Sequence, residues 1–449
     1  MGSQNHGSKI EPRTLEERLV YWSIVGTWAL WLTGLLYILS AVLGYVLLSI
    51  LGYRILWPAA SDPEPRMPPP AVLAWIAGTL AMAFALIAAH IDYDLGAASL
   101  VKSFVGWIKG WALLAVYPLV GATMSIRPEV VSRATCLLCV QTLLLIPFFI
   151  LADIAGAPKD LYLPPWAELI GTGNEFFEVS LFGLEDGRAR YRFYAPWSTA
   201  AAFVASLGLV VALQERSWRW RIAVVLSTIA VCNMAGSRTS VIVLPATLVL
   251  VIVLANLWRP STWLAIAALA TASLLMSGEL INLYQDATDA FAAARAASSR
   301  VRTALGNIAV HRWLTEAPIF GHGILDRGGQ VVERMLIGSH HTWWGLLFVK
   351  GAVGFLGLAL PFAWSFIELT AKAQCDRVAR LGLGILVSIM LFSMADNIEI
   401  IAYLIWPALV FLGIAFRRRL FWPTVGYLGR RDKSPEPAEM ILKGSPIPS

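Results

Sequence analysis

The chain has 449 residues, of which 57% are hydrophobic and only 14% are charged. Soluble domains carry about 45–50% apolar and about 25% charged residues, so this composition excludes an ordinary soluble protein. The net charge of +6 lies mostly in short segments between apolar runs and in the C-terminal tail, which does not indicate a nucleic-acid surface. Each apolar run is long enough for the roughly 20 residues that a helix needs to cross a membrane. We therefore expect an all-α fold, a polytopic integral membrane helical bundle.

In chain order, residues 1–18 are polar and are expected to form a cytoplasmic N-terminal segment. The apolar stretch 19–57 is either a hairpin of two short helices or one long helix, which gives a total of twelve or eleven spans. The other expected spans are 71–91, 104–126, 134–154, 196–214, 220–236, 239–258, 262–277, 345–370, 379–395 and 399–416. Residues 417–449 form a basic, Pro-rich tail, which we expect to be cytoplasmic and disordered.

Basic clusters orient these spans. The clusters lie in residues 216–221, at 259, in 372–380 and in 417–419, at alternate ends of successive spans and therefore on one side of the membrane. The positive-inside rule places all four in the cytoplasm. Two long polar segments must then face outward. These are 155–195, an outward loop within the first part of the bundle (19–277), and 278–344, a large outward loop before the final helices (345–416).

Several arginines lie in or beside the outward segments, where the positive-inside rule does not explain them. They are Arg190, Arg192, Arg238, Arg300 and Arg302. A set of arginines on this side predicts an anionic ligand, and the planar guanidinium is well suited to phosphate because it donates two parallel hydrogen bonds. The alternative is that these arginines meet lipid headgroups or pair with nearby acids.

The stretch "GSHHTWWGLLFVKGAVG" (338–354) places two histidines before an apolar run. Ser339 is a plausible N-cap, which puts His340 and His341 in the first turn of a helix. The positive end of the helix dipole disfavours a charged imidazolium there, and a neutral imidazole can act as a general base. The alternative is an aromatic belt, in which Trp343 and Trp344 anchor the interface and the histidines are only polar.

Taken together, four motifs resemble one known family. "PIFGHGI" (318–324) and the histidine stretch resemble the Pro-hydrophobe-Gly-x-Gly and "HN/HS…L…G…G" patterns of the O-antigen ligase and Wzy-type polymerase superfamily. "RYRFYAPWSTAAAF" (190–203) and "GSRTS" (236–240) resemble its arginine-bearing span start and its "SRT" turn. The resemblance covers approximately residues 190–360.

The resemblance implies an enzyme of the bacterial inner membrane with its active site facing the periplasm. Its donor would be an undecaprenyl-diphosphate-linked oligosaccharide, and no metal or cofactor is expected. The family histidine aligns with His340, because Gly351 then keeps the usual spacing, but His341 stands where the family has Asn or Ser, so the general base is His340 or His341. The family's diphosphate-binding arginines correspond to Arg238, to Arg190 or Arg192, and to Arg300 or Arg302.

The resemblance leaves two reactions open. One is polymerisation of capsular, exopolysaccharide or O-antigen repeat units, with a flippase and a chain-length regulator as partners; the version of the histidine motif favours it. The other is ligation of a glycan to lipid A core. An anion transporter of similar span count, with the arginines as a vestibule, and a catalytically inert scaffold are further alternatives.

Overall fold

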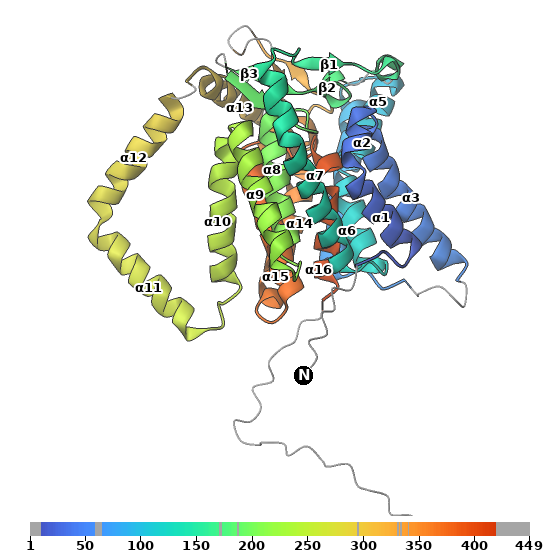
Figure 1. Cartoon of the computed structure of the whole chain (residues 1–449). Coiled ribbons are helices and arrows are strands. Elements are labelled where there is room, and N and C mark those ends of the chain that lie inside the picture. The colour runs from blue at the N-terminus through green and yellow to red at the C-terminus, as the bar shows by residue number, and fades with distance from the viewer. Residues whose placement is uncertain are drawn as a thin grey trace, which may run out of the picture.

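The computed structural model describes residues 10–58, 65–169, 173–185, 188–293, 296–329, 332, 335–339 and 341–418. It confirms the all-α bundle of upright helices (Figure 1). The helices are α1 (Leu15–Val25), α2 (Thr27–Leu32), α3 (Leu36–Leu56), α4 (Pro70–Asp92), α5 (Ala97–Lys109), α6 (Leu113–Thr123), α7 (Pro128–Ile154), α8 (Ser198–Ala212), α9 (Trp218–Ala235), α10 (Arg238–Leu254), α11 (Pro260–Leu275), α12 (Ser277–Ala293), α13 (Ala296–Glu316), α14 (Thr342–Ala373), α15 (Arg377–Ser393) and α16 (Ala402–Phe416).

Short antiparallel strand pairs cover one end of the bundle. The pairs are β1 (Asp160–Tyr162) with β2 (Val179–Ser180), β3 (Phe182–Glu185) with β4 (Arg188–Tyr191), and β5 (Asp326–Arg327) with β6 (Leu336–Ile337). The end at which β1 to β4 lie is called the strand-bearing end below (Figure 1). The basic connections after α8, α10, α14 and α16 all fall at the opposite end, as the alternation of basic clusters predicts.

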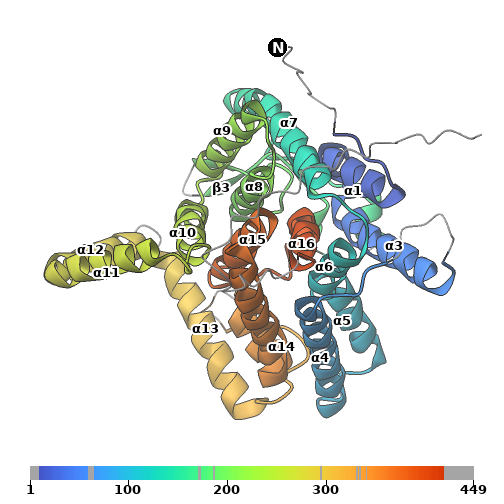
Figure 2. The ribbon, with the colours of Figure 1, turned by 90° about the horizontal axis from the view of Figure 1, so that it is seen from below.

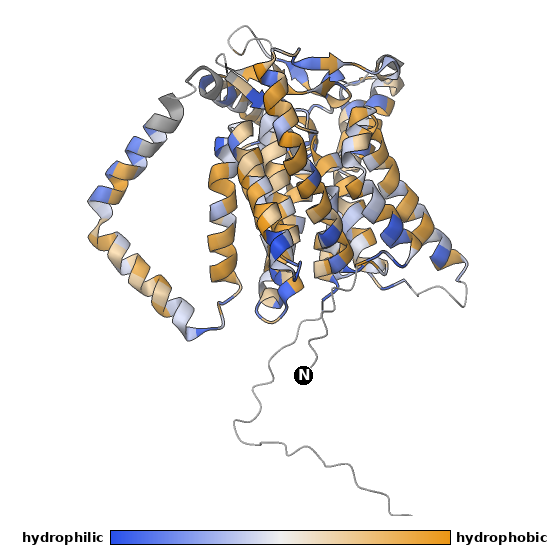
Figure 3. Ribbon diagram, viewed as in Figure 1, coloured by the Kyte–Doolittle hydropathy of each residue, from blue (hydrophilic) through white to orange (hydrophobic). Residues whose placement is uncertain are grey.

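The chain is a multi-pass membrane protein. Five helical units in the described residues are long and apolar enough to cross a membrane: α3, α4, α5 with α6, α7, and α14. A sixth is α11 with the first part of α12, which is bent by 81°, while α8, α10 and α16 are apolar but shorter. Figure 3 shows hydrophobic residues along the helices and hydrophilic ones gathered toward their ends. The total of eleven or twelve spans stays a prediction.

The first apolar stretch is a helical hairpin, one of the two alternatives that the sequence allows. The chain turns after α2 at Gly34, whose φ of +71° suits glycine. Arg54 near the end of α3 then donates hydrogen bonds of 3.0 Å to both carboxylate oxygens of Glu16 at the start of α1. This pairing of the two outer ends closes the hairpin.

Glycines bring helix backbones into direct contact where the bundle is tightest. A Cβ at Gly78 of α4 would overlap the carbonyl oxygen of Gly357 in α14, and a Cβ at Gly121 of α6 would overlap that of Val410 in α16. Within a membrane, helices associate mainly by such close packing, because lipid provides no hydrophobic drive for burial. The pairs α4 with α14 and α6 with α16 are therefore the most closely packed helices of the bundle.

The segment expected to be a long periplasmic loop, 278–344, is largely helical. It contains most of α12 and all of α13. Both α11 and α12 project away from the bundle (Figures 1 and 2). In contrast, α13 packs on the first half of α14, where the ring of Trp344 fills the space beside Gly306. The second half of the segment 278–344 thus contains a helix, α13, that packs against the start of α14.

The backbone of α14 is broken at Gly351, which has φ +60° and ψ −159°. The loop that follows α13 lies across this break. His322 and Gly323 donate backbone hydrogen bonds of 2.9 Å to Phe348 O and Val349 O, and on the other side Ala352 and Val353 donate to Pro318 O (3.0 Å) and Ile319 O (3.2 Å). Non-helical backbone at membrane depth requires such replacement partners. The "PIFGHG" motif therefore has a structural role, because its backbone forms hydrogen bonds with the N–H and C=O groups of α14 on both sides of the break.

Replacing Gly351 by alanine should destabilise the protein. This region of φ and ψ is essentially restricted to glycine, at a cost of about 1–3 kcal/mol for other residues, and the new Cβ would overlap Ile319 O. Thermal unfolding in detergent should show a clearly lowered melting temperature for Gly351→Ala. Gly52→Ala is the matched control, because nothing lies within 4 Å of its Cβ position and alanine is favoured in a helix by roughly 0.5–1 kcal/mol. Equal melting temperatures for the two variants would contradict this account of the break.

Candidate functional site

The structure places the sequence-predicted residues on elements that meet at the strand-bearing end. Arg190 lies on β4, with Arg192 directly after it; Arg238 begins α10; Arg300 and Arg302 lie on α13; and His341 directly precedes α14. His340 lies outside the described residues.

His341 is the N-cap residue of α14. Its Nδ1 accepts hydrogen bonds from the backbone N–H of Trp343 (3.2 Å) and Trp344 (3.4 Å), and its Nε2 lies 2.9 Å from Met394 O. This combination assigns the neutral tautomer with the proton on Nε2, because Nδ1 must accept and Nε2 must donate. Both ring nitrogens are therefore occupied, and in this arrangement His341 has no lone pair left for a substrate proton.

The turn between α15 and α16, residues 393–398, holds the backbone around the histidines. The hydroxyl of Thr342 donates to Asp396 O at 2.6 Å, and the side-chain amide of Asn397 donates to Ser339 O at 3.2 Å. The backbone just before and just after the two histidines is thus fixed to one turn. The sequence does not predict this contact, because Asp396 and Asn397 lie more than fifty residues after the histidines.

Asp396 also contributes a carboxylate to this end of the bundle. The carboxylate accepts hydrogen bonds from the hydroxyl of Thr199 (3.3 Å), from the indole of Trp197, and from the backbone N–H of Asn397 (2.8 Å). Burial raises the pKa of Asp396, although these hydrogen bonds and the charge of Arg302 oppose the shift. A carboxyl group with a raised pKa beside an arginine is typical of groups that exchange protons.

Arg302 is the arginine that joins this group. Its Nη1 donates to Ala395 O at 3.3 Å, and no other described residue accepts a hydrogen bond from it. Its charge acts on both Asp396 and His341. Arg302, His341 and Asp396 together form a cluster, called the Arg302 cluster below, in which one guanidinium retains donors for an anionic ligand.

The other arginines are engaged in structural contacts. Arg190 donates its Nε to Ala235 O (2.9 Å) and an Nη to Gly236 O (2.8 Å), so it satisfies carbonyls at the C-terminal end of α9. Arg192 donates to the hydroxyl of Ser180 at 3.4 Å. These two arginines stabilise the strand region of the same end. Sequence reasoning could not separate them from Arg302, because all of them occur in outward segments.

Arg238 and Arg300 are the two remaining arginines that the sequence predicts for this site. Arg238 begins α10 directly after the turn at Ser237, whose side chain caps the helix by accepting from Ser240 N. Arg300 is exposed on α13, two residues before Arg302. The contacts with the 393–398 turn thus distinguish Arg302 from Arg300, which the family pattern left as alternatives.

Groups suited to a metal ion are not assembled here. The described residues contain no cluster of three or more His, Cys, Asp or Glu side chains that could hold one. His322 is occupied elsewhere, with Nδ1 3.0 Å from Phe348 O and Nε2 2.8 Å from a carboxylate oxygen of Glu316.

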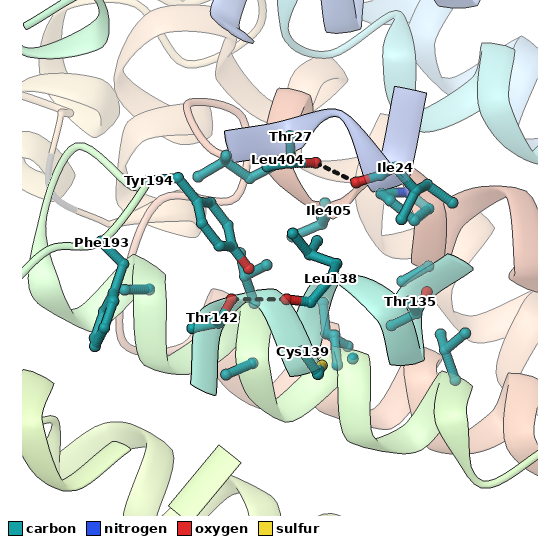
Figure 4. A pocket seen from close by; sticks show the side chains of 18 of the residues that line it. Ile24, Thr27, Thr135, Leu138, Cys139, Thr142, Phe193, Tyr194, Leu404 and Ile405 are labelled. Carbon is teal, nitrogen blue, oxygen red and sulfur yellow. Dashed lines mark hydrogen bonds between the residues drawn. The ribbon is translucent and has the colours of Figure 1, made fainter. Parts of the chain in front are cut away.

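An apolar cavity of about 50 Å³ lies between α1, α2, α3, α7, α8, α9 and α16 (Figure 4). Its threonine hydroxyls are turned to their own helices: Thr27 donates to Ile24 O (2.8 Å) and Thr142 to Leu138 O (2.9 Å). With these hydroxyls satisfied, the lining is mostly apolar. Periodicity in the sequence could not reveal the cavity, because its walls come from segments far apart in the chain.

Comparison with other proteins assigns no family to this chain. No protein-family model matches the sequence, and no curated protein matches it.

Protonation of His341 should make the protein less stable in acid. Burial lowers the pKa of His341; the hydrogen bond to Met394 opposes the shift and the charge of Arg302 adds to it. The folded state therefore favours the neutral ring. The neutral ring of His341 makes its full contribution to the free energy of unfolding above about pH 6.5, the pKa of histidine in the unfolded chain. This contribution is lost as the pH falls through the lower pKa that His341 has in the folded protein.

The contribution of His341 to stability is tested with the variant His341→Asn, which keeps a side chain that can cap the helix but has no titrating ring. Melting temperatures in detergent should show the wild type losing more stability than the variant between about pH 7 and pH 5, the range that spans the unfolded pKa. Parallel pH curves for the two proteins would rule out this role for His341.

Proposed function

We propose that this protein is a membrane glycosyltransferase that uses a lipid-diphosphate-linked oligosaccharide as donor. The Arg302 cluster is the single observation that carries the proposal. It combines a guanidinium that donates only to Ala395 O among the described residues, a partly buried carboxyl group and the positive end of α14 at one end of a membrane bundle. Arginine and a helix N-terminus both favour an anionic group such as a diphosphate.

The reaction would be a single displacement at the anomeric carbon. The acceptor hydroxyl forms a bond to that carbon while the bond to the diphosphate oxygen breaks, and a base takes the hydroxyl proton. Arg302 stabilises the negative charge that develops on the leaving diphosphate. The base is Asp396 or His340, because both nitrogens of His341 are engaged.

Two further features agree with a lipid-linked donor. The cavity of Figure 4 offers an apolar lining for part of a hydrocarbon chain. The four basic connections lie at the end opposite to the Arg302 cluster, so the positive-inside rule would orient the cluster toward the periplasm of a bacterial inner membrane. We propose polymerisation of repeat units as the reaction, with ligation to lipid A core as the alternative.

Arg302→Ala should reduce transfer strongly. Removal of one donor to a developing charge typically lowers the rate by about 10²–10³-fold. The assay is glycan transfer in proteoliposomes supplied with an undecaprenyl-diphosphate-linked oligosaccharide. Arg259→Ala is the control, because Arg259 is an exposed arginine at the opposite end of the bundle. If transfer is unchanged in Arg302→Ala at normal protein levels, the diphosphate role is wrong.

Asp396→Asn and His340→Ala identify the base. Loss of a general base costs about 10²–10⁴-fold in rate, so one of the two variants should show a loss in this range while the other shows a smaller change. The same variants, tested in a strain whose surface polysaccharide depends on this protein, should reproduce the order. Full activity in both variants would exclude general-base catalysis by either residue.

An anion transporter is the second candidate, and one observation favours it. The break in α14 and the buried Lys350 beside it are the discontinuous helix and intramembrane charge that transporters use. Proteoliposomes without lipid-linked donor separate the two functions: uptake of labelled phosphate that depends on Lys350 would favour a transporter, and donor-dependent glycan transfer without uptake would favour the enzyme.

A further inference from the structure

Two connections at the end opposite to the strand-bearing end bring three arginines together. Arg216 lies between α8 and α9, Arg221 lies in the first turns of α9, and Arg377 begins α15. Arg216 and Arg221 are close enough for each to repel the charge of Arg377. These three residues are called the arginine patch below. Like charges held together in this way disfavour the folded state unless an anion binds beside them.

The acids next to the arginine patch in the sequence are engaged elsewhere. Glu215 is buried, and its carboxylate accepts hydrogen bonds of 2.9 Å from Arg133 Nε and from the backbone N–H of Arg216. Asp376 is the N-cap of α15 and accepts from Ala379 N at 2.8 Å. Neither carboxylate pairs with a guanidinium of the patch in the part of the chain that the structure describes. The positive charge of the patch is therefore not neutralised by these two acids.

Two guanidiniums of the arginine patch are fixed in place and still keep hydrogen-bond donors. Arg377 donates one Nη to Leu213 O at 2.6 Å, and Arg221 donates its Nε to Glu215 O at 2.6 Å. The remaining N–H groups of both stay available. The exposed side chain of Arg216 donates to no described residue. Fixed guanidiniums with available donors are well suited to a phosphate group.

An exposed apolar stripe runs along α9 from the arginine patch. Ile222, Leu226 and Ile229 are 48%, 52% and 62% exposed, and their spacing places them on one face of the helix. Trp218 begins this face and is 66% exposed. An exposed tryptophan at the end of a membrane helix is typical of the depth at which lipid headgroups lie. The stripe thus provides a surface for acyl chains directly beside a surface for phosphate.

We propose that the arginine patch binds the phosphate of an anionic phospholipid, whose acyl chains lie along the exposed stripe of α9. A soluble anion would contact the charged part alone and leave the stripe unused. The lipid phosphate joins the α8–α9 connection to the start of α15 by offsetting the repulsion between their arginines. This inference does not depend on the proposed function, because the patch and the Arg302 cluster lie at opposite ends of the bundle.

Native mass spectrometry of the full chain in detergent measures such lipid binding directly. The probes are dioleoyl phosphatidylglycerol and dioleoyl phosphatidylcholine, which share their acyl chains and differ in net charge. Phosphatidylglycerol should bind more tightly, and Arg216→Gln should weaken its binding by about fivefold, the size expected of one arginine at a membrane surface. Phosphatidylcholine binding should be the same in the variant and the wild type. Arg259→Gln is the matched control, because Arg259 is an exposed arginine at the same end but outside the patch.

Two further arms complete the test. Without added lipid, Arg216→Gln should melt at the wild-type temperature, because its side chain bonds to no described residue. Inorganic phosphate should not displace phosphatidylglycerol, since phosphate has no acyl chains for the stripe. Equal binding of the two lipids, unchanged phosphatidylglycerol binding in Arg216→Gln, an equal loss in Arg259→Gln, or displacement by phosphate would each overturn the proposal.

Discussion

The strand-bearing end depends on how the backbone of α14 is satisfied where the helix stops at Gly351. Four hydrogen bonds from the loop after α13 replace the ones that the helix lacks. Two glycines make this possible, because Gly321 and Gly351 approach each other so closely that a Cβ on either would meet backbone atoms. The loop thereby fixes α13 beside the first turns of α14, and α13 carries Arg302. A constraint on backbone polar groups in lipid thus sets the position of a charged side chain.

Charge is distributed unevenly over this end. Arg302 donates to Ala395 O in the 393–398 turn, whereas Glu178 lies near the cations Arg192 and Lys159 and the carboxylate of Asp160. The indole of Trp197 bonds to the carboxylate of Asp396.

Composition and apolar runs were sufficient to predict the helical membrane bundle, because burial in lipid demands long apolar helices. The hairpin in 19–57 could not be decided, since the ion pair between Arg54 and Glu16 is a contact between distant residues. The N-cap position of the histidine segment was expected at Ser339, but His341 occupies it. Local sequence cannot show this, because the start of α14 is set by the distant turn at 393–398. Arg302 was named with Arg300 as an alternative, and only tertiary contacts separate them.

The close contact of Gly78 with Gly357 has a mechanical consequence. Below the break, α14 is joined backbone to backbone to α4. Above it, the short piece from Thr342 to Lys350 is attached to α13 and to the 393–398 turn. The sequence predicts one continuous helix here, but the structure has two helical segments with different neighbours, which meet at Gly351. The position of the first part of α14 is therefore set by α13 and the 393–398 turn, and that of the second part by α4.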